Sequence, residues 1–357
     1  MSIIAGARLR ERPFEYTANG VTVVLNAGRG VGAPGQVDGD NSGKIYTAVN
    51  ETQLRAIINE GDANTDLTGF CTTLVTNMEG TISPRYQITP FINSGSNQDI
   101  SSWDVSNVTT MRFMFMNTTA FNQPLNNWNV GNVTSMVSMF KNSIFNQSLN
   151  NWDVGNVTNM SGMFRDSIFN QPLNNWDVSS VTDMGSMFAD ASSFNKPLDN
   201  WDVSSVTKFN NMFNGALLFN QNINNWNLSS ATTIGAMFSD TTAFNQPLNN
   251  WDVSNVTNMS SMFTSSIFNQ PLNNWDVGNV TDMLGMFSNT TAFNQPLNNW
   301  DVSNVTIMIS MFFNAEAFNQ DLSGWCVTNI ASEPPQFDTD ADAWVLANSR
   351  PIWGTCP

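Results

Sequence analysis

The carboxylates that could do chemistry in this sequence recur at one fixed place, directly after a tryptophan. They are Asp104, Asp153, Asp177, Asp202, Asp252, Asp276 and Asp301. Asn129, Asn227 and Cys326 stand at the same place in the remaining copies. If the tryptophan side chains point inward, these Asp side chains point outward and form an acidic ladder with a spacing of about 5 Å. Carboxylate oxygens are preferred ligands of Ca²⁺, so the ladder is a candidate cation-bridged or ligand-binding face.

A structural role is the favoured interpretation of this acidic ladder. Each Asp can accept hydrogen bonds from the amides of the turn that follows it, and Asn does this equally well. The replacement by Asn129 and Asn227 therefore favours the structural role. A binding ladder would behave differently, because repulsion between close carboxylates raises some of their pKa values or recruits cations. A cation-bridged ladder predicts that EDTA lowers the melting temperature.

Two further candidates concern metal binding and cysteine chemistry. Asp38, Asp40 and Ser42 resemble the start of a Ca²⁺ loop, but the Glu that closes such a loop is missing, which favours a turn. The three Cys residues lack zinc-site spacing. Cys326 and Cys356 either form a disulfide that pins the C-terminal tail or remain two buried thiols.

Composition limits the function classes. The 357 residues include no His, which removes the usual general base and the Ser-His and Cys-His nucleophile pairs, so we expect no enzyme. The net charge of −16 argues against binding to nucleic acid or to anionic membranes. Residues 1–8 do not read as a secretory signal, and no run of about 18 apolar residues predicts a membrane span. Apart from the weak Ca²⁺ candidates, we expect no cofactor.

A tandem repeat must position these residues. Ten Trp residues, from Trp103 to Trp325, recur at intervals of 24 or 25 residues. One unit, residues 145–164, reads FNQSLNNWDVGNVTNMSGMF, and length varies only between its final Met-Phe and the next Phe-Asn. A period this short is typical of a solenoid, in which each unit stacks on the previous one.

The spacing inside a unit predicts an α/β repeat. Leu149-x-x-Trp152-x-Val154 has the apolar spacing of a leucine-rich repeat, and its last part alternates as a strand does. The apolar residues over 157–164 fit a helical turn or short helix behind that strand. We therefore expect a leucine-rich-repeat-like solenoid with one short parallel strand per repeat.

Other repeated positions are expected to be structural. The Trp, Met and Phe positions predict a continuous core. The Asn that follows Phe should satisfy backbone groups of the turns, and identical Asn residues can form an amide ladder between copies. These residues are Asn122, Asn146, Asn170, Asn195, Asn220, Asn245, Asn269, Asn294 and Asn319.

The chain divides into four predicted parts. They are an N-terminal docking segment with one strand (1–43), an N-terminal cap (44–96), the repeat solenoid (97–330) and a C-terminal cap (331–357). In the N-terminal cap, Asn50 and Gly61 bound a predicted helix. Phe70 then marks a degenerate first repeat, where it stands at the Trp position. Atypical ends are expected because an exposed core edge must be covered.

Units of the form F-N-x-P-L-N-x-W-D-V-S-N-V-T-N-M-x-x-M-F resemble the BspA-like repeats of bacterial surface proteins. These repeats form a variant leucine-rich-repeat family that is also common in mycoplasma lipoproteins. The resemblance covers about residues 97–330, in nine near-identical copies. It implies a leucine-rich-repeat-like solenoid with adhesive or binding roles, and it implies no catalytic residues.

The leading functional expectation is a non-enzymatic structural or adhesion protein. Because no export signal is recognised, we expect a phage virion protein, a tail or capsid appendage or decoration protein that binds the host or environmental surface. The alternative is a BspA-like bacterial surface adhesin exported without a recognisable signal, so the expected location is a virion or an extracellular surface. The N-terminal segment would dock on other virion or surface proteins, and the solenoid would bind a surface protein or glycan. Association with further copies of the same chain, as a homo-oligomer, is also consistent with such an appendage.

Overall fold

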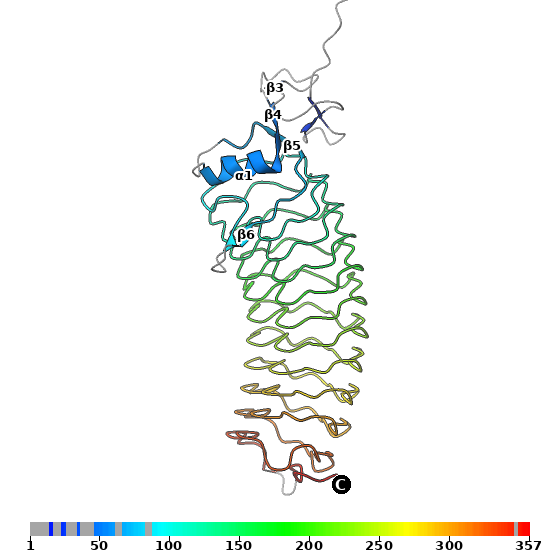
Figure 1. The fold of residues 1–357 in the computed structure, drawn as a ribbon. Helices are drawn as coiled ribbons and strands as arrows, with labels where there is room; N and C mark the ends of the chain where they lie inside the picture. The colour runs from blue at the N-terminus through cyan, green and yellow to red at the C-terminus, as the bar shows by residue number, and fades with distance from the viewer. Residues whose placement is uncertain are drawn as a thin grey trace, which may run out of the picture.

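The computed structural model describes residues 14–16, 23–25, 34–35, 46–60, 66–82, 88–345 and 349–357. Its tandem repeats are coils stacked one on another along a single direction, with the N-terminal elements at one end and the C-terminus at the other (Figure 1). Regular secondary structure is concentrated before residue 90. We refer to the coils between residues 97 and 330 as the repeat stack. None of the helices described is long and apolar enough to cross a membrane.

The N-terminal elements form three small sheets and one helix. They are β1 (Phe14–Tyr16), β2 (Val23–Leu25), β3 (Pro34–Gly35), β4 (Tyr46–Asn50), α1 (Glu51–Glu60), β5 (Phe70–Leu74), β6 (Thr81–Ile82) and β7 (Ile88–Thr89). The pairs β1–β2 and β6–β7 are antiparallel. The third sheet has the order β3-β4-β5, in which β4 pairs antiparallel with β3 and parallel with β5. A strand of the predicted docking segment thus pairs directly with the predicted cap.

The helix α1 begins where the sequence predicts, after Asn50. The Asn50 side chain accepts a hydrogen bond from the Gln53 amide at 3.0 Å, and the Gln53 side chain accepts one from the Asn50 amide at 3.3 Å. This reciprocal pair is a capping box, which satisfies two amides that the first turn leaves open. Leu54 and Ile58 face the core and are buried. The predicted C-terminal stop, Gly61, lies outside the described residues.

The degenerate first repeat is in register with the stack, as the sequence predicts from Phe70. Asn77, seven residues after Phe70, pairs in parallel with Thr110, which stands seven residues after Trp103. The indole of Trp103 donates to the Leu67 carbonyl at 3.1 Å, the same bond that later Trp residues make to the preceding repeat.

The parallel pairing lies at a different place in the repeat from the predicted strand. Trp-x-Val does not pair between repeats, because the Trp amide and the Val carbonyl bond locally within the same repeat. The Trp152 amide donates to the Leu149 carbonyl at 3.0 Å, and the Val157 amide to the Val154 carbonyl at 2.9 Å. One isolated parallel bridge per repeat occurs instead, seven residues after Trp. The bridged residues are Asn77, Thr110, Ser135, Asn159, Asp183, Lys208, Thr233, Asn258, Asp282 and Ile307.

The sequence predicts a helical turn or a short helix behind the strand, and of these two alternatives the short helix is wrong. Residues 160–166 form successive turns in which Gly162 and Asp166 adopt left-handed conformations, with φ of 64° and 57°. Their amides donate to Gly185 and Ala189 of the next repeat at 2.9 and 2.8 Å, whereas a helix would bond them within the segment. Left-handed residues therefore replace the helix with a ribbon of turns bonded between repeats. Among the described residues α1 is the single helix.

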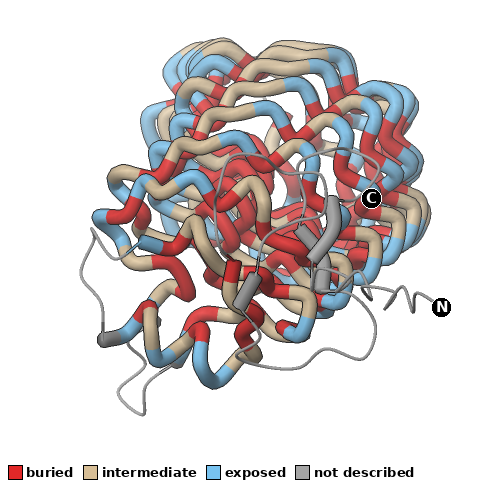
Figure 2. Tube along the Cα trace, turned by 90° about the horizontal axis from the view of Figure 1, so that it is seen from above, coloured by how far each residue is buried: buried red, intermediate tan, exposed pale blue. Residues whose placement is uncertain are grey.

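The predicted core is confirmed. The Trp, Val, Met and Phe positions of the repeats are buried, and buried positions line the inside of each coil while exposed ones face outward (Figure 2). Equivalent rings stack between neighbouring repeats, as Trp152 and Trp176 do with centroids 6.4 Å apart and planes 2° apart. The Trp152 indole also donates to the Leu125 carbonyl at 2.9 Å, so the buried N–H is satisfied.

The C-terminal end closes the core with rings that are turned edge-on. Trp344 lies against Phe312 and Phe318 at interplanar angles of 74° and 84°, whereas the rings inside the stack are nearly parallel. Arg350 covers the Trp344 ring at 4.6 Å and forms an ion pair with Asp338 at 2.7 Å. These residues cover the aromatic face that the next repeat would have covered.

Candidate functional site

The acidic ladder lies along the repeat stack, and each of its Asp residues is engaged in its own turn. Six of the seven predicted Asp residues are exposed, whereas Asp104 is buried. In each of the seven copies one carboxylate oxygen accepts a hydrogen bond from the amide two residues later; for Asp153 the donor is Gly155 at 3.2 Å. Asn129 accepts the equivalent bond from Gly131 at 3.2 Å. These are the bonds that the structural interpretation predicts.

These hydrogen bonds also lower the pKa of several carboxyls in the acidic ladder. The Ser179 hydroxyl at 2.6 Å, together with the Ser179 amide, lowers the pKa of the Asp177 carboxyl below its ordinary value. Bonds from the hydroxyl and amide of the following serine also lower the pKa of Asp202, Asp252 and Asp301. Repulsion between neighbours therefore does not dominate in these copies, and the raised pKa values expected of a binding ladder are not found there.

Other repeated polar residues are used to bond one repeat to the next. The Asn146 amide donates to the Asn122 side chain at 2.9 Å, and the same bond recurs at each predicted Asn position that follows Phe. The Asn156 side chain donates to the Gly131 carbonyl at 2.7 Å, and the Thr158 hydroxyl donates to the Thr134 carbonyl at 3.2 Å. The near-constant polar positions of the repeat thus have structural tasks.

Two positions of the repeat vary strongly in charge and size, and sequence reasoning missed them. They stand seven and nine residues after Trp, on either side of a buried position, so their side chains project to the same side of the stack. We call this surface the variable face. It is formed by Thr110, Arg112, Ser135, Val137, Asn159, Ser161, Asp183, Gly185, Lys208, Asn210, Thr233, Gly235, Asn258, Ser260, Asp282, Leu284, Ile307 and Ile309. Comparison of the copies within the sequence would have revealed it.

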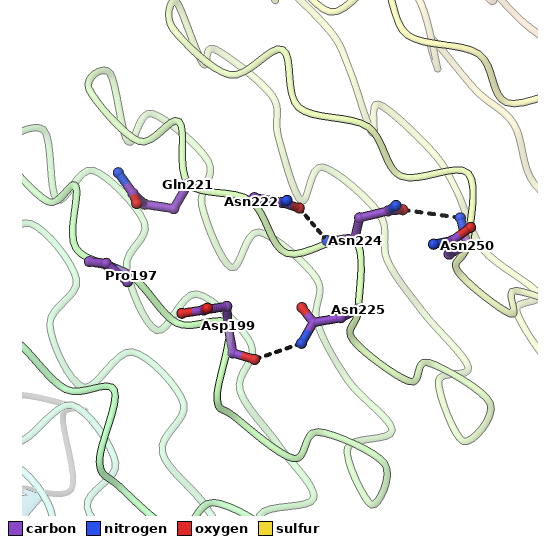
Figure 3. Close-up of a pocket in the computed structure, with 7 residues that line it drawn as sticks. All are labelled: Pro197, Asp199, Gln221, Asn222, Asn224, Asn225 and Asn250. Atoms are coloured by element: carbon purple, nitrogen blue, oxygen red, sulfur yellow. Dashed lines mark hydrogen bonds between the residues drawn. The ribbon is translucent and has the colours of Figure 1, made fainter.

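A polar hollow of about 410 Å³ lies on another side of the coils (Figure 3). Its amide side chains are already bonded to the stack. Asn225 donates to the Asp199 carbonyl at 2.7 Å, and the Asn224 side chain accepts from the Asn250 amide at 3.1 Å. We therefore regard this hollow as a consequence of the repeat geometry.

The other predicted sites have different outcomes. The structure joins Cys326 and Cys356 in a disulfide, one of the two alternatives left open by the sequence. This bond ties the C-terminal end to the last repeat. The weak Ca²⁺ candidates Asp38, Asp40 and Ser42 lie outside the described residues. Within the described part of the chain, no group of three or more His, Cys, Asp or Glu residues could hold a metal ion.

Comparison with known proteins identifies the repeat. A family described as "Mycoplasma protein of unknown function, DUF285" matches in four overlapping stretches, residues 52–167, 86–197, 158–267 and 237–344. These stretches begin in α1 and end at the C-terminal aromatic cluster, so they cover the repeat stack and most of both caps. No curated protein and no solved structure matches the chain. The matched stretches span well over half of the sequence, and the chain therefore belongs to this mycoplasma-type repeat family.

Proposed function

We propose that this chain is a non-enzymatic attachment protein whose repeats form a solenoid that binds a surface. The observation that carries the proposal is that different positions of the repeat serve structure and vary in sequence. Near-constant polar residues bond the coils together, whereas variation is marked on the variable face. A stiff repeat array that can change one face without losing its fold is suited to multivalent recognition.

The electrostatics of the acidic ladder argue against a role for these carboxyls as general acids. A general acid needs a pKa near the working pH, which usually requires a carboxyl group with a raised pKa. Asp177, Asp202, Asp252 and Asp301 have lowered pKa values and remain ionised at neutral pH. These carboxylates are better suited to fixing turns and to keeping the surface hydrated than to donating protons.

The proposed setting is a virion, with the chain as a tail or capsid appendage or decoration protein. The N-terminal residues 1–43 would dock on the particle, and the repeat stack would contact the host or environmental surface. The alternative setting is a bacterial surface, where the chain would act as an adhesin. In both settings, residues 1–43 would anchor the chain and the repeat stack would contact the target surface.

The test compares the full chain with a variant that lacks residues 1–43. We expect both to fold and to bind target cells, the shortened chain melting at a lower temperature because it lacks the pairing of β3 with β4, and only the full chain to associate with purified particles. Loss of cell binding by the shortened chain would contradict the proposed division. Recovery of the protein from the secreted fraction of a bacterium that carries no phage genes beside its gene would favour the adhesin setting instead.

A further inference from the structure

A second hollow, of about 420 Å³, lies on and beside the variable face and spans four consecutive repeats. Its volume falls within the range of about 300–1,000 Å³ typical of small-molecule sites. Three of its lining residues are cationic: Lys141, Arg165 and Lys208. The sequence between residues 97 and 325 holds only five Lys and Arg residues, so most of the positive charge of the repeat stack gathers at this one place.

Two glycines line this hollow at places where neighbouring side chains approach closely. A Cβ atom at Gly185 would lie 3.2 Å from the side-chain oxygens of Asn210 and Asp183, and one at Gly162 would lie 2.9 Å from the Ser138 hydroxyl. Later repeats carry Asn210, Gly235, Ser260, Leu284 or Ile309 at the place of Gly185, and none of them has a Lys or Arg at the place that Lys141 and Arg165 occupy. The hollow is therefore a local feature of these repeats and does not recur with every coil.

The cations at the hollow are only partly neutralised. Arg165 pairs with Asp166 at 3.3 Å, and Lys208 pairs with Asp183 at 3.5 Å. Lys141 takes part in none of the ion pairs among the described residues. It occupies the same place in its repeat as Arg165 does in the next, and the two repeats are bonded there. Neighbouring like charges repel, and a bound anion would relieve that repulsion.

We propose that this hollow binds an acidic saccharide, with a sulfate or carboxylate group held by Lys141 and Arg165. The inference rests on the proposed attachment function and names the class of ligand. Charged hydrogen bonds from an ammonium and a guanidinium group suit an oxyanion. Ser138, Ser161 and other neutral hydrogen-bonding groups that line the hollow suit sugar hydroxyls.

The test measures binding of the full chain to dextran sulfate, polygalacturonate and neutral dextran. One variant combines Lys141→Ser, Arg165→Ser and Lys208→Thr, which introduce residue types that stand at the same places in other repeats. A second variant, Gly185→Leu, fills the hollow without changing its charge. We expect binding to the two acidic polymers and not to neutral dextran, and a Kd increase of about tenfold or more in both variants.

A control variant distinguishes binding at the hollow from a general effect of the protein's positive charge. Lys196→Gln removes one positive charge outside the hollow and introduces the residue found at that place in other repeats. It should change the Kd less than about twofold, whereas Lys141→Ser alone should raise the Kd clearly more. Melting temperatures of the variants that replace Lys or Arg should stay close to that of the wild type, and the Gly185→Leu variant should remain folded.

Three results would overturn the inference. They are unchanged binding by the triple variant, equal weakening by Lys196→Gln and Lys141→Ser, and competition by inorganic sulfate at the same molar concentration as the saccharide. The last result would assign the hollow to a free anion. A chain that attaches to cells but binds neither acidic polymer would refute this inference alone. A chain that attaches to no cell or particle would refute the proposed function.

Discussion

Replacement of Gly285 by alanine tests the ribbon of turns that takes the place of the predicted helix. Gly285 has a φ of 58°, in the left-handed region. A Cβ atom there would approach no atom closer than 3.5 Å, so the cost comes from the backbone conformation alone. An L-residue pays about 1–2 kcal/mol in this conformation, and Gly→Ala recovers about 0.4–1 kcal/mol from the unfolded chain. We expect Gly285→Ala to lower the free energy of unfolding by about 1 kcal/mol.

Gly155→Ala is the matched control. Gly155 lies outside the left-handed region, and its Cβ would make ordinary contacts, 3.4 Å from Asp153 and 3.5 Å from Asp177. This variant should be neutral or more stable by up to about 1 kcal/mol. Chemical denaturation of the full chain at constant m-value measures both changes. If Gly285→Ala instead stabilised the protein by about 0.5–1 kcal/mol, as it would inside a helix, the turn geometry would be refuted.

Three further predictions concern the acidic ladder and the C-terminal end. Asp177→Asn should lower the free energy of unfolding less than Asp177→Ala does, because Asn keeps the turn bond as Asn129 does in its own repeat. Asp177→Ala should lower it by about 0.5 kcal/mol, and equal effects would refute the turn role. Four ladder carboxyls have lowered pKa values, so their stabilising effect is present above the unfolded value of about 3.9 and is lost as the pH falls through their folded values. Asp190 has the opposite effect, because burial raises its pKa and its contribution to stability is lost as the pH rises. The free energy of unfolding should still be lower at about pH 3 than at about pH 5, and a higher value at pH 3 would contradict this reasoning. Reduction of the Cys326–Cys356 disulfide should destabilise the C-terminal end by about 2–4 kcal/mol, and an unchanged melting curve after verified reduction would contradict this role.

The repeat period, the core and the caps could be predicted because each depends on a strong local pattern. Trp152 and its equivalents are buried as the apolar spacing indicates. Asn50 caps α1 because its side chain can replace a missing helical bond. Phe70 stands in register with the Trp residues even though the next unit is separated by a longer insertion.

The internal geometry of the repeat could not be predicted from apolar spacing alone. Spacings of three and one fit a helix and a series of turns equally well, since both return side chains to the same side. The position of Asp166 carries the missing signal, because its equivalents are nearly all Asn, Asp or Gly, the residues that best tolerate a left-handed conformation. The pairing site was missed because hydrogen bonding depends on where the backbone turns, which alternation does not reveal.

The candidate site was missed for a related reason. Asp153 and its equivalents attract attention because they repeat, and they repeat because each one fixes a turn. Residues free to serve binding need not repeat, so the variable face appears in the sequence as a departure from the pattern. Lys208 at a position that holds Asp183 in the preceding repeat is such a departure.

Attachment to target cells by two triple variants of the full chain tests the central claim most directly. One variant combines Lys141→Ser, Arg165→Ser and Lys208→Thr at the hollow. The other replaces three consecutive Asp residues of the acidic ladder, Asp153, Asp177 and Asp202, with Asn. We predict that the hollow variant loses attachment and that the ladder variant retains it, with both melting near the wild-type temperature. Retention by the hollow variant and loss by the ladder variant would contradict the account and assign binding to the acidic ladder.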